Sequence, residues 1–525
     1  MIAMKKYKIV IIFLIPFLML SCENWLNDHE IGDQLITETF FNSIDDLEKV
    51  LNGGYAALLG VEGEGLASSP FFIATLAGDF VAPFAPNYDK LPQHFLNEYR
   101  RLHSSSGPNS FGKRYMKYLS RATNNVIDAL ENGSLEDQPK FKERNGRIRG
   151  EAYMLRALGN FEITKLVGKQ YNSSSSSSDL AGLYPIKPIF SASDVPTTRL
   201  TVEESYNKLI VDLETAIELL PVQFQPDQNS PFYGTRRFTK DAARALLAKV
   251  YFQKHDFENA KSLVDSILGP TPGDPDKYPL TKGRDLDEIY WNSEDEPYGP
   301  DRIDEDDAEI ICDFLGESEQ GGPNAEFNVY GFALTPDPVF GEMGRSRIDE
   351  DYAKGYFAMS ERFISYVDFD PGDSRYQVFI DEIPADDFDG NLVMYWWPIK
   401  FASDGINVMW YRSAEFILMR AECNARLGNE QDAIEDLNAI KDRAGVDFYE
   451  SDPFAMPTLI EEIIRERARE LYLENYRYWE LLRLGSLGEA NLHPGDRFGD
   501  DIAIGDATGV NWDDPALLYE LPDYE

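Results

Sequence analysis

The sequence has few basic side chains, few histidines and no long apolar run beyond its first 21 residues. Lys and Arg number 50 against 91 Asp and Glu, so the net charge is −41. That charge argues against a nucleic-acid binder and against electrostatic adsorption to an anionic membrane, since both need clustered basic residues. The five histidines are scattered without the spacing of a zinc site. No later segment reaches the roughly 20 apolar residues that a spanning helix needs.

The remaining composition is that of a globular protein with a large core. Apolar residues make up 43% and charged residues 27% of the 525 positions, which excludes a disordered or collagen-like chain. The length corresponds to roughly three or four domains. Because the chain carries 28 Tyr, 32 Phe and 7 Trp, the core need not use every aromatic ring, and some are available to a binding surface.

Residues 1–21 have the features of an export signal. Three lysines within the first eight residues precede an apolar run from Ile9 to Leu20, which is too short to span a bilayer. Ser21 and Cys22 at its end resemble the lipobox of bacterial lipoproteins, which implies a diacylglyceryl group and palmitate-type chains on Cys22. Since each buried methylene contributes about 0.8 kcal/mol, three chains would anchor the protein firmly. The alternative is plain secretion with Cys22 incidental.

The two later cysteines, Cys312 and Cys423, leave two interpretations open. An exported protein passes through an oxidising compartment, where these thiols can form a disulfide. Both also lie on apolar stretches, where an isolated cysteine commonly acts as a small buried hydrophobic residue.

Helical periodicity dominates the mature chain. Residues 113–131 and 147–167 carry apolar side chains at helical spacing. Residues 201–204 and 458–461 each read Thr-x-x-Glu, which predicts a capping box at the start of a helix. The first of these helices is expected to end at Pro221.

Two segments, 243–272 and 416–443, align with each other. Each carries two alanines twelve positions apart, Ala248 and Ala260 in the first, and this spacing is the tetratricopeptide pattern. Small side chains at these positions permit close approach of two helices. The segments therefore predict helix pairs, although residues 273–410 separate them.

Several stretches lack helical periodicity. They are residues 60–110, 168–200 and 273–410, of which the last is rich in Pro, Gly, Asp and aromatics. The serine run 173–178 predicts a mobile surface loop, because serines cannot fill a core. Residues 485–525 predict an extended tail that packs on the scaffold. Long loops in a helical scaffold are usually functional.

The candidate motifs for nucleotide and calcium binding each lack residues that the chemistry requires. Residues 107–113 match most of a phosphate-binding loop, but Arg114 stands where Ser or Thr should hold magnesium and no strand precedes it, so a turn is expected. Residues 387–390 lack the acidic residues that open and close a calcium loop. The acidic run 301–309 predicts a solvated face. A pair of carboxylates for glycoside hydrolysis acts at a separation in space, so a hydrolase stays open as an alternative.

The segment 460–485 resembles the signature of the SusD/RagB family of surface lipoproteins from Gram-negative bacteria. The positions that fit are Glu474, Arg477, Trp479, Leu481, Arg483 and Gly485. Asn475, Tyr476 and Glu480 replace the family's Gly, His and Asp. Further stretches that resemble the family, in the same order along the chain, are 147–166, 184–220, 400–401, 411–422 and 518–522.

The resemblance implies a mainly α fold of tetratricopeptide-type helix pairs with an inserted, irregular, loop-rich ligand lobe. The expected organisation is a lipoprotein signal peptide at 1–21, an N-terminal half at 22–220 and a C-terminal half at 221–525. The inserted lobe lies at about 273–410. No cofactor and no metal are expected.

The resemblance also implies a role at the outer membrane, facing the cell exterior. Family members act in nutrient uptake as lids over a TonB-dependent transporter of the SusC type, and capture oligosaccharides or, in some cases, peptides. The helical face is expected to dock on the transporter and the loop-rich face to meet the ligand. The protein is then no enzyme. The alternatives are a repeat scaffold that binds only proteins, and a surface glycan hydrolase.

Sugar capture suits aromatic rings, which offer flat surfaces to the apolar C–H faces of sugars. The candidate ligand-binding residues in the irregular stretches are Phe84, Tyr88, Trp291, Tyr298, Tyr330, Trp396 and Trp397. Each of these rings also suits a place in the core or against a loop. Since neighbours on a strand face opposite sides, at most one of Trp396 and Trp397 should reach a ligand. Tyr478 and Trp479 are assigned to the core.

Overall fold

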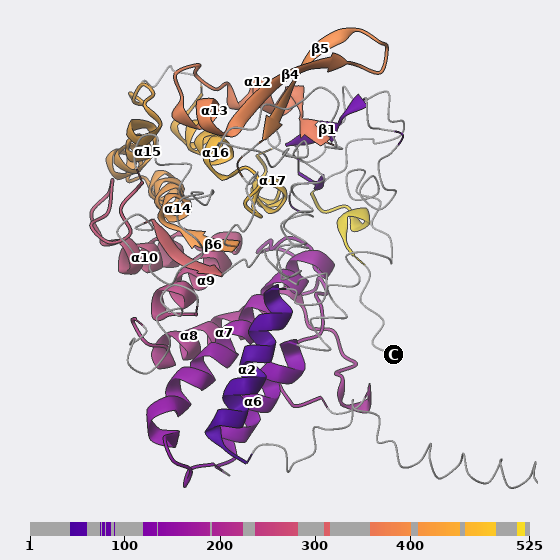
Figure 1. Ribbon diagram of the computed structural model, residues 1–525, viewed down its shortest axis with the longest axis vertical. Helices are drawn as coiled ribbons and strands as arrows, with labels where there is room; N and C mark the ends of the chain where they lie inside the picture. Colours follow the sequence, from indigo (N-terminus) through magenta and orange to yellow (C-terminus); the bar gives the residue numbers. More distant parts are fainter. Residues whose placement is uncertain are drawn as a thin grey trace, which may run out of the picture.

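The computed structural model consists mainly of helices, as the sequence predicts (Figure 1). Apart from isolated residues, it describes the ranges 42–59, 76–85, 119–189, 192–223, 237–281, 309–314, 357–400, 408–451, 457–489 and 512–519. The helices of the body are α2 (Ile44–Leu59), α6 (Arg121–Glu131), α7 (Phe141–Val167), α8 (Val202–Leu219), α9 (Lys240–Gln253), α10 (Phe257–Leu268), α14 (Ser413–Leu427), α15 (Glu430–Ala444), α16 (Leu459–Leu471) and α17 (Arg477–Ser486). Among the described residues, no helix is long and apolar enough to cross a membrane.

The helices pack successively, so that chain order becomes spatial order. Helices α2 and α6 pack on α7, α7 packs on α8, and α8 packs on α9. Figure 1 shows this progression from α2 and α6 at one end of the body to α14, α15 and α16 toward the other. The crossing of α7 and α8 is close because Gly150 has no side chain; a Cβ there would lie 3.0 Å from the Leu220 Cγ. Both predicted capping boxes are present, at Thr201 and Thr458.

The two segments with the repeat pattern fold as helix pairs, α9 with α10 and α14 with α15. Their spaced alanines are fully buried; these are Ala248, Ala260, Ala421 and Ala433. Although 273–410 separates the pairs in sequence, α10 packs directly on α14. Arg420 joins them: it binds both oxygens of Asp436 on α15 and donates to the Gly269 carbonyl, at 2.7 Å, after α10. The tetratricopeptide class of these pairs stays a prediction.

Two small antiparallel sheets interrupt the helical body. The four-stranded sheet has the order β1-β3-β5-β4, and the two-stranded sheet pairs β2 with β6. The strand bounds are β1 (Val81–Pro83), β2 (Ile310–Phe314), β3 (Phe357–Met359), β4 (Ile380–Asp386), β5 (Leu392–Pro398) and β6 (Val408–Arg412). Two short helices, α12 (Glu361–Val367) and α13 (Ser374–Phe379), lie between β3 and β4. The irregular stretch 273–410 therefore contributes most of the sheet structure.

The structure shows where two core aromatics, the two later cysteines and part of the C-terminal tail lie. Tyr478 and Trp479 are buried in the core as expected. Cys312 and Cys423 are both buried, and no disulfide joins them in this structure. In the tail, the Tyr519 amide donates to the Leu166 carbonyl at 2.9 Å, which packs this part of the tail on α7.

The serine run 173–178 forms hydrogen-bonded turns that are mostly exposed, as the prediction of a surface loop requires, but Ser176 is buried. The mobility of the run stays a prediction. The Ser176 hydroxyl accepts from the Asn172 amide at 2.8 Å, and its carbonyl accepts from the Glu203 amide in the first turn of α8. Serine hydroxyls satisfy local backbone groups, so a serine run can make ordered turns without filling a core.

Candidate ligand-binding site

The candidate site is built on the β4–β5 hairpin, which extends beyond the neighbouring described elements in Figure 1. The strands pair in register from Ile380 opposite Pro398 to Asp386 opposite Leu392. At the turn, the Asp387 carboxylate accepts from the backbone amides of Asp389 and Asn391 at 2.9 and 2.7 Å. These backbone hydrogen bonds lower the pKa of Asp387. Residues 387–390, which carry part of a calcium-loop pattern, therefore form a hairpin turn.

One face of the hairpin packs on a small aromatic cluster. Phe84, which follows β1, lies edge-on to Tyr395 and Trp397, with ring centroids 4.8 and 4.9 Å apart. Trp397 is 0% exposed and Phe84 is 2% exposed. Edge-to-face contacts of this kind add to the free energy gained by burial. The cluster therefore fixes the hairpin against β1.

The opposite face of β5 carries Trp396. Strand alternation places its side chain beside that of Glu382, its cross-strand partner on β4. The Tyr376 hydroxyl of α13 donates to Glu382. Trp396 is only partly buried and packs on the main core at its inner edge. As the strand periodicity predicts, the two tryptophans lie on opposite faces of β5: Trp397 is buried in the aromatic cluster, and Trp396 packs on the main core while keeping part of its surface exposed.

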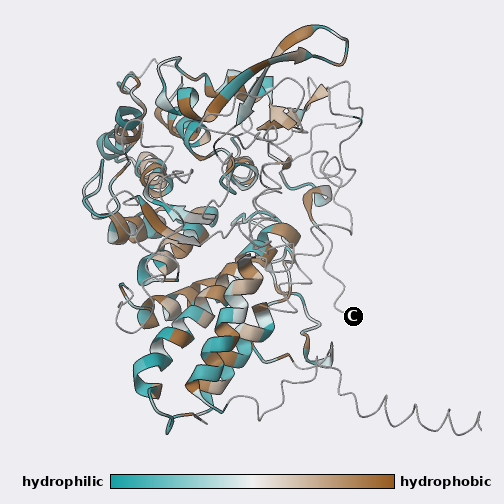
Figure 2. Ribbon diagram, in the orientation of Figure 1, coloured by the Kyte–Doolittle hydropathy of each residue, from teal (hydrophilic) through white to brown (hydrophobic). Residues whose placement is uncertain are grey.

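Exposed apolar side chains lie at and beside the polar turn of the hairpin. Phe388, Leu392 and Met394 are 49%, 74% and 43% exposed. Figure 2 shows the hydrophobic colour along part of the hairpin and the hydrophilic colour at its turn. Since Leu392, Met394 and Trp396 alternate along β5 on one face, they form a continuous apolar stripe that we call the hairpin stripe.

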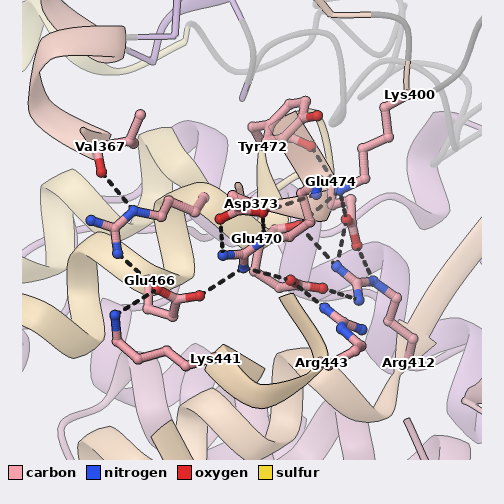
Figure 3. Close-up of polar contacts among 12 residues, drawn as sticks. Val367, Asp373, Lys400, Arg412, Lys441, Arg443, Glu466, Glu470, Tyr472 and Glu474 are labelled. Atoms are coloured by element: carbon pink, nitrogen blue, oxygen red, sulfur yellow. Dashed lines mark hydrogen bonds and ion pairs between the residues drawn. The ribbon is translucent and has the colours of Figure 1, made fainter. Parts of the chain in front are cut away.

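A buried ionic network holds the base of the hairpin (Figure 3). Arg375 in α13, just before β4, contacts Glu466 and Glu470 of α16 at 2.7 and 3.0 Å. Lys400, just after β5, donates to the Glu470 carbonyl at 2.8 Å and pairs with Glu474. Both ends of the hairpin segment are therefore tied to α16 and the residues that follow it.

The centre of the network is Arg412, at the end of β6. Its guanidinium contacts Glu309 at 2.7 Å, Glu470 at 2.6 Å and Glu474 at 2.7 Å. Arg443 of α15 pairs with Glu309 at 3.0 Å and also with Glu470. All five side chains are almost completely shielded from solvent. The network joins β2, β6, α15 and α16 in one cluster.

The charges in this network are held in their ionised states by their partners. Burial by itself would raise the pKa of Glu470, but the arginines Arg443, Arg412 and Arg375 hold it well below its usual range. Burial also opposes ionisation of Glu466, and its cationic partners nevertheless lower its pKa to about 2. Burial lowers the pKa of Lys400 to about 8. Carboxylates with such low pKa values are poor general acids.

Of the predicted ligand-binding residues that the structure describes, two are buried and one is partly exposed. Phe84 and Trp397 are buried in the aromatic cluster, so in this conformation neither ring face is open to a sugar, and the two residues support the hairpin instead. Trp396 retains exposed surface. Four candidates and the anchor residue lie outside the described residues; they are Tyr88, Trp291, Tyr298, Tyr330 and Cys22.

Sequence reasoning missed Glu309 and Arg375. Glu309 ends the acidic run that was expected to form a solvated face, yet it is fully buried between Arg412 and Arg443. The sequence offers one signal: Glu309 directly precedes the apolar triplet 310–312. Among the described residues, no group of acidic, histidine or cysteine side chains is arranged to hold a metal ion.

Comparison with known proteins gives consistent matches. A model of the SusD family matches residues 368–515, and a second, described as starch-binding and associating with the outer membrane, matches residues 26–252. The chain is 23% identical to SusD-like protein P38 of Formosa agariphila, covering 91% of this chain and 92% of that protein.

Solved structures agree in fold. The crystal structure of a SusD superfamily protein from Bacteroides vulgatus superposes with a TM-score of 0.68 at 20% identity, covering 92% of this chain and 96% of that one. A laminarin-binding SusD-like protein gives a TM-score of 0.64 at 19% identity, covering 91% and 96%. The similarity therefore extends over nearly the whole chain.

Proposed function

The chain belongs to the SusD/RagB family, and from that premise we propose that it is a surface lipoprotein that captures oligosaccharides without cleaving them. It is anchored to the outer membrane through Cys22 and forms the lid of a SusC-type TonB-dependent transporter. The description of one matching family model, starch-binding and associating with the outer membrane, supports this assignment.

The observation that carries the proposal is the partial exposure of Trp396 on a hairpin that is fixed at its base. Its partial exposure leaves ring surface for a sugar, while Tyr376 and Glu382 beside it supply hydrogen-bonding groups for hydroxyls. Because the ionic network ties both ends of the hairpin to the body, little ordering is needed on binding.

The ionic network also supports a binding role over a hydrolytic one. A glycosidase needs one carboxylic acid with a raised pKa near a second carboxylate. In the described part of the chain, the closely spaced carboxylates Glu466, Glu470 and Glu474 are saturated by cations and have lowered pKa values. Such a cluster stabilises structure and does not donate protons.

Isothermal titration of the protein against a panel of neutral polysaccharides, laminarin and starch included, tests the proposal. We expect Trp396→Ala to weaken binding about tenfold or more, since base or sugar stacking on an aromatic ring contributes about 1–3 kcal/mol. Phe448→Ala is the matched control, because Phe448 is a 58% exposed aromatic in the α15–α16 connection. Release of new reducing ends by the pure protein would contradict the non-catalytic assignment.

A second candidate function, docking of proteins alone, is favoured by the hairpin stripe. An exposed apolar ribbon of this kind commonly marks a protein interface. Under this alternative, Leu392→Asp should abolish co-purification with a barrel transporter while no polysaccharide binds the unmodified protein. Retention of the transporter by Leu392→Asp, together with a glycan titration signal, would exclude it.

A further inference from the structure

A second polar cluster surrounds a buried cavity of about 30 Å³ where α7, α9, α14, α16 and α17 meet. The charged side chains that line it are Lys165, Lys249, Glu415, Arg467, Glu480 and Arg483. Apolar and aromatic side chains, among them Phe161 and Trp479, complete the walls. The cavity is separate from the hairpin and from the network of Figure 3.

The cavity wall contains hydrogen-bond donors that have no partner among the described residues. They are the Arg467 Nη1, the Arg483 Nε and the Tyr476 hydroxyl, all from buried side chains. Only one unpartnered acceptor lines the same cavity, the Gln253 Oε1. Buried polar atoms are normally hydrogen-bonded, so a group of unpartnered donors in one cavity indicates an occupant. The excess of donors over acceptors indicates one that mainly accepts.

The carboxylates around the cavity are already engaged. Glu480 accepts from the Arg467 Nε at 2.6 Å, and Glu415 pairs with Lys249 at 2.7 Å. The Arg483 guanidinium uses both terminal nitrogens to bind Glu422 and stacks on the Phe252 ring, with its Cζ 4.0 Å from the ring centroid. The cations therefore keep N–H groups that the neighbouring acids do not satisfy.

We propose that this cavity binds a single halide-sized anion, with chloride as the available ion. A single buried water needs a cavity volume of about 10–15 Å³, so the cavity of about 30 Å³ has room for one chloride or about two waters. Chloride accepts from several donors at once, whereas a water must also find acceptors. Each of the four cations already has a carboxylate partner, Lys165 with Glu162 at 2.9 Å among them, so the unpartnered N–H and O–H groups are what the anion would bind. Burial lowers the pKa of Lys165 beside the cavity, and a bound anion would counter this effect. The ion would link α7 and α9 to α16 and α17.

The test uses the full mature chain in sodium chloride or sodium gluconate at matched ionic strength. At chloride concentrations above the dissociation constant, the midpoint temperature of thermal unfolding should rise about 1 °C for each tenfold increase in chloride. In gluconate it should stay constant. Lys165→Met should remove this dependence. Lys261→Met, which breaks a surface pair with Asp265, is the matched control and should retain it.

Crystals of the unmodified protein grown in sodium bromide give a readout that does not depend on a variant folding. An anomalous bromide peak inside the cavity supports the proposal. Water density without an anomalous peak, or identical midpoints in chloride and gluconate, overturns it.

Discussion

Substitution of Arg412 by Gln is the sharpest perturbation that the ionic network offers. Arg412 is 2% exposed and binds three carboxylates and the Glu470 carbonyl. Gln has the length for one of these hydrogen bonds and lacks the charge. The substitution therefore removes the cation shared by Glu309, Glu470 and Glu474 without removing their remaining partners.

The expected magnitude follows from those remaining partners. Breaking a buried ion pair by removing one member costs about 3–5 kcal/mol. Here Glu309 and Glu470 keep Arg443, and Glu474 keeps Lys400. No carboxylate is left fully unpaired, so we expect the free energy of unfolding to fall by about 3 kcal/mol, the lower end of that range.

Urea unfolding followed by tryptophan fluorescence measures this change as a lower midpoint. The pH dependence supplies a second signature. Glu470 and Glu474, which Arg412 contacts, have lowered pKa values in the folded protein, so their contribution to stability is present above the usual value of about 4.5 and is lost as pH falls below it. Because Arg412→Gln removes part of that contribution, its difference from the unmodified protein should stay constant from pH 7 to about pH 5 and shrink as pH falls further.

Arg465→Gln is the control for this experiment. Arg465 lies in the same helix α16, but its side chain is 26% exposed and its contact with Glu462 is 3.9 Å long. A partly exposed pair of this kind contributes about 0–1 kcal/mol. Equal midpoints for the two variants, or a difference that stays constant with pH, would refute the assigned role of the network.

Two further substitutions test the helix pairs and the anchor. Ala433→Leu should lower the free energy of unfolding, measured by urea unfolding, by about 1–3 kcal/mol, because a larger side chain overpacks the α14–α15 contact. Leu427→Ala, at an exposed position, should change this free energy much less. Cys22→Ala should release the protein from the membrane fraction or leave it misprocessed, and unchanged membrane retention would contradict the lipid anchor.

The helical body could be read from the sequence because its determinants are local. Capping boxes at Thr201 and Thr458 need only a hydroxyl and a glutamate three residues later. Alanines at 248 and 260 indicate close helix contacts through spacing alone. The placement of Trp396 and Trp397 on opposite faces of β5 likewise follows from strand alternation.

The candidate site could be predicted only in part. Local patterns identified the aromatic residues but not which rings the core would use, since burial depends on segments far apart in sequence. Phe84 and Trp397 are separated by more than 300 positions and still share one cluster. The charged residues show the same limit, because the apolar triplet after Glu309 is its one local signal, and its partners Arg412 and Arg443 lie 103 and 134 positions away.

Residue type and spacing along the chain were enough to identify the helices, their caps and the resemblance to the SusD/RagB family. The return of the inserted segment to the body depends on long-range packing instead. This packing brings Arg375 and Arg412 to carboxylates of α16, and Lys400 to the Glu470 carbonyl of the same helix, over separations of about 60 to 100 residues. Charges at such distances along the chain are brought together by the packing of the whole fold, since Coulomb attraction is screened over about a nanometre in solution.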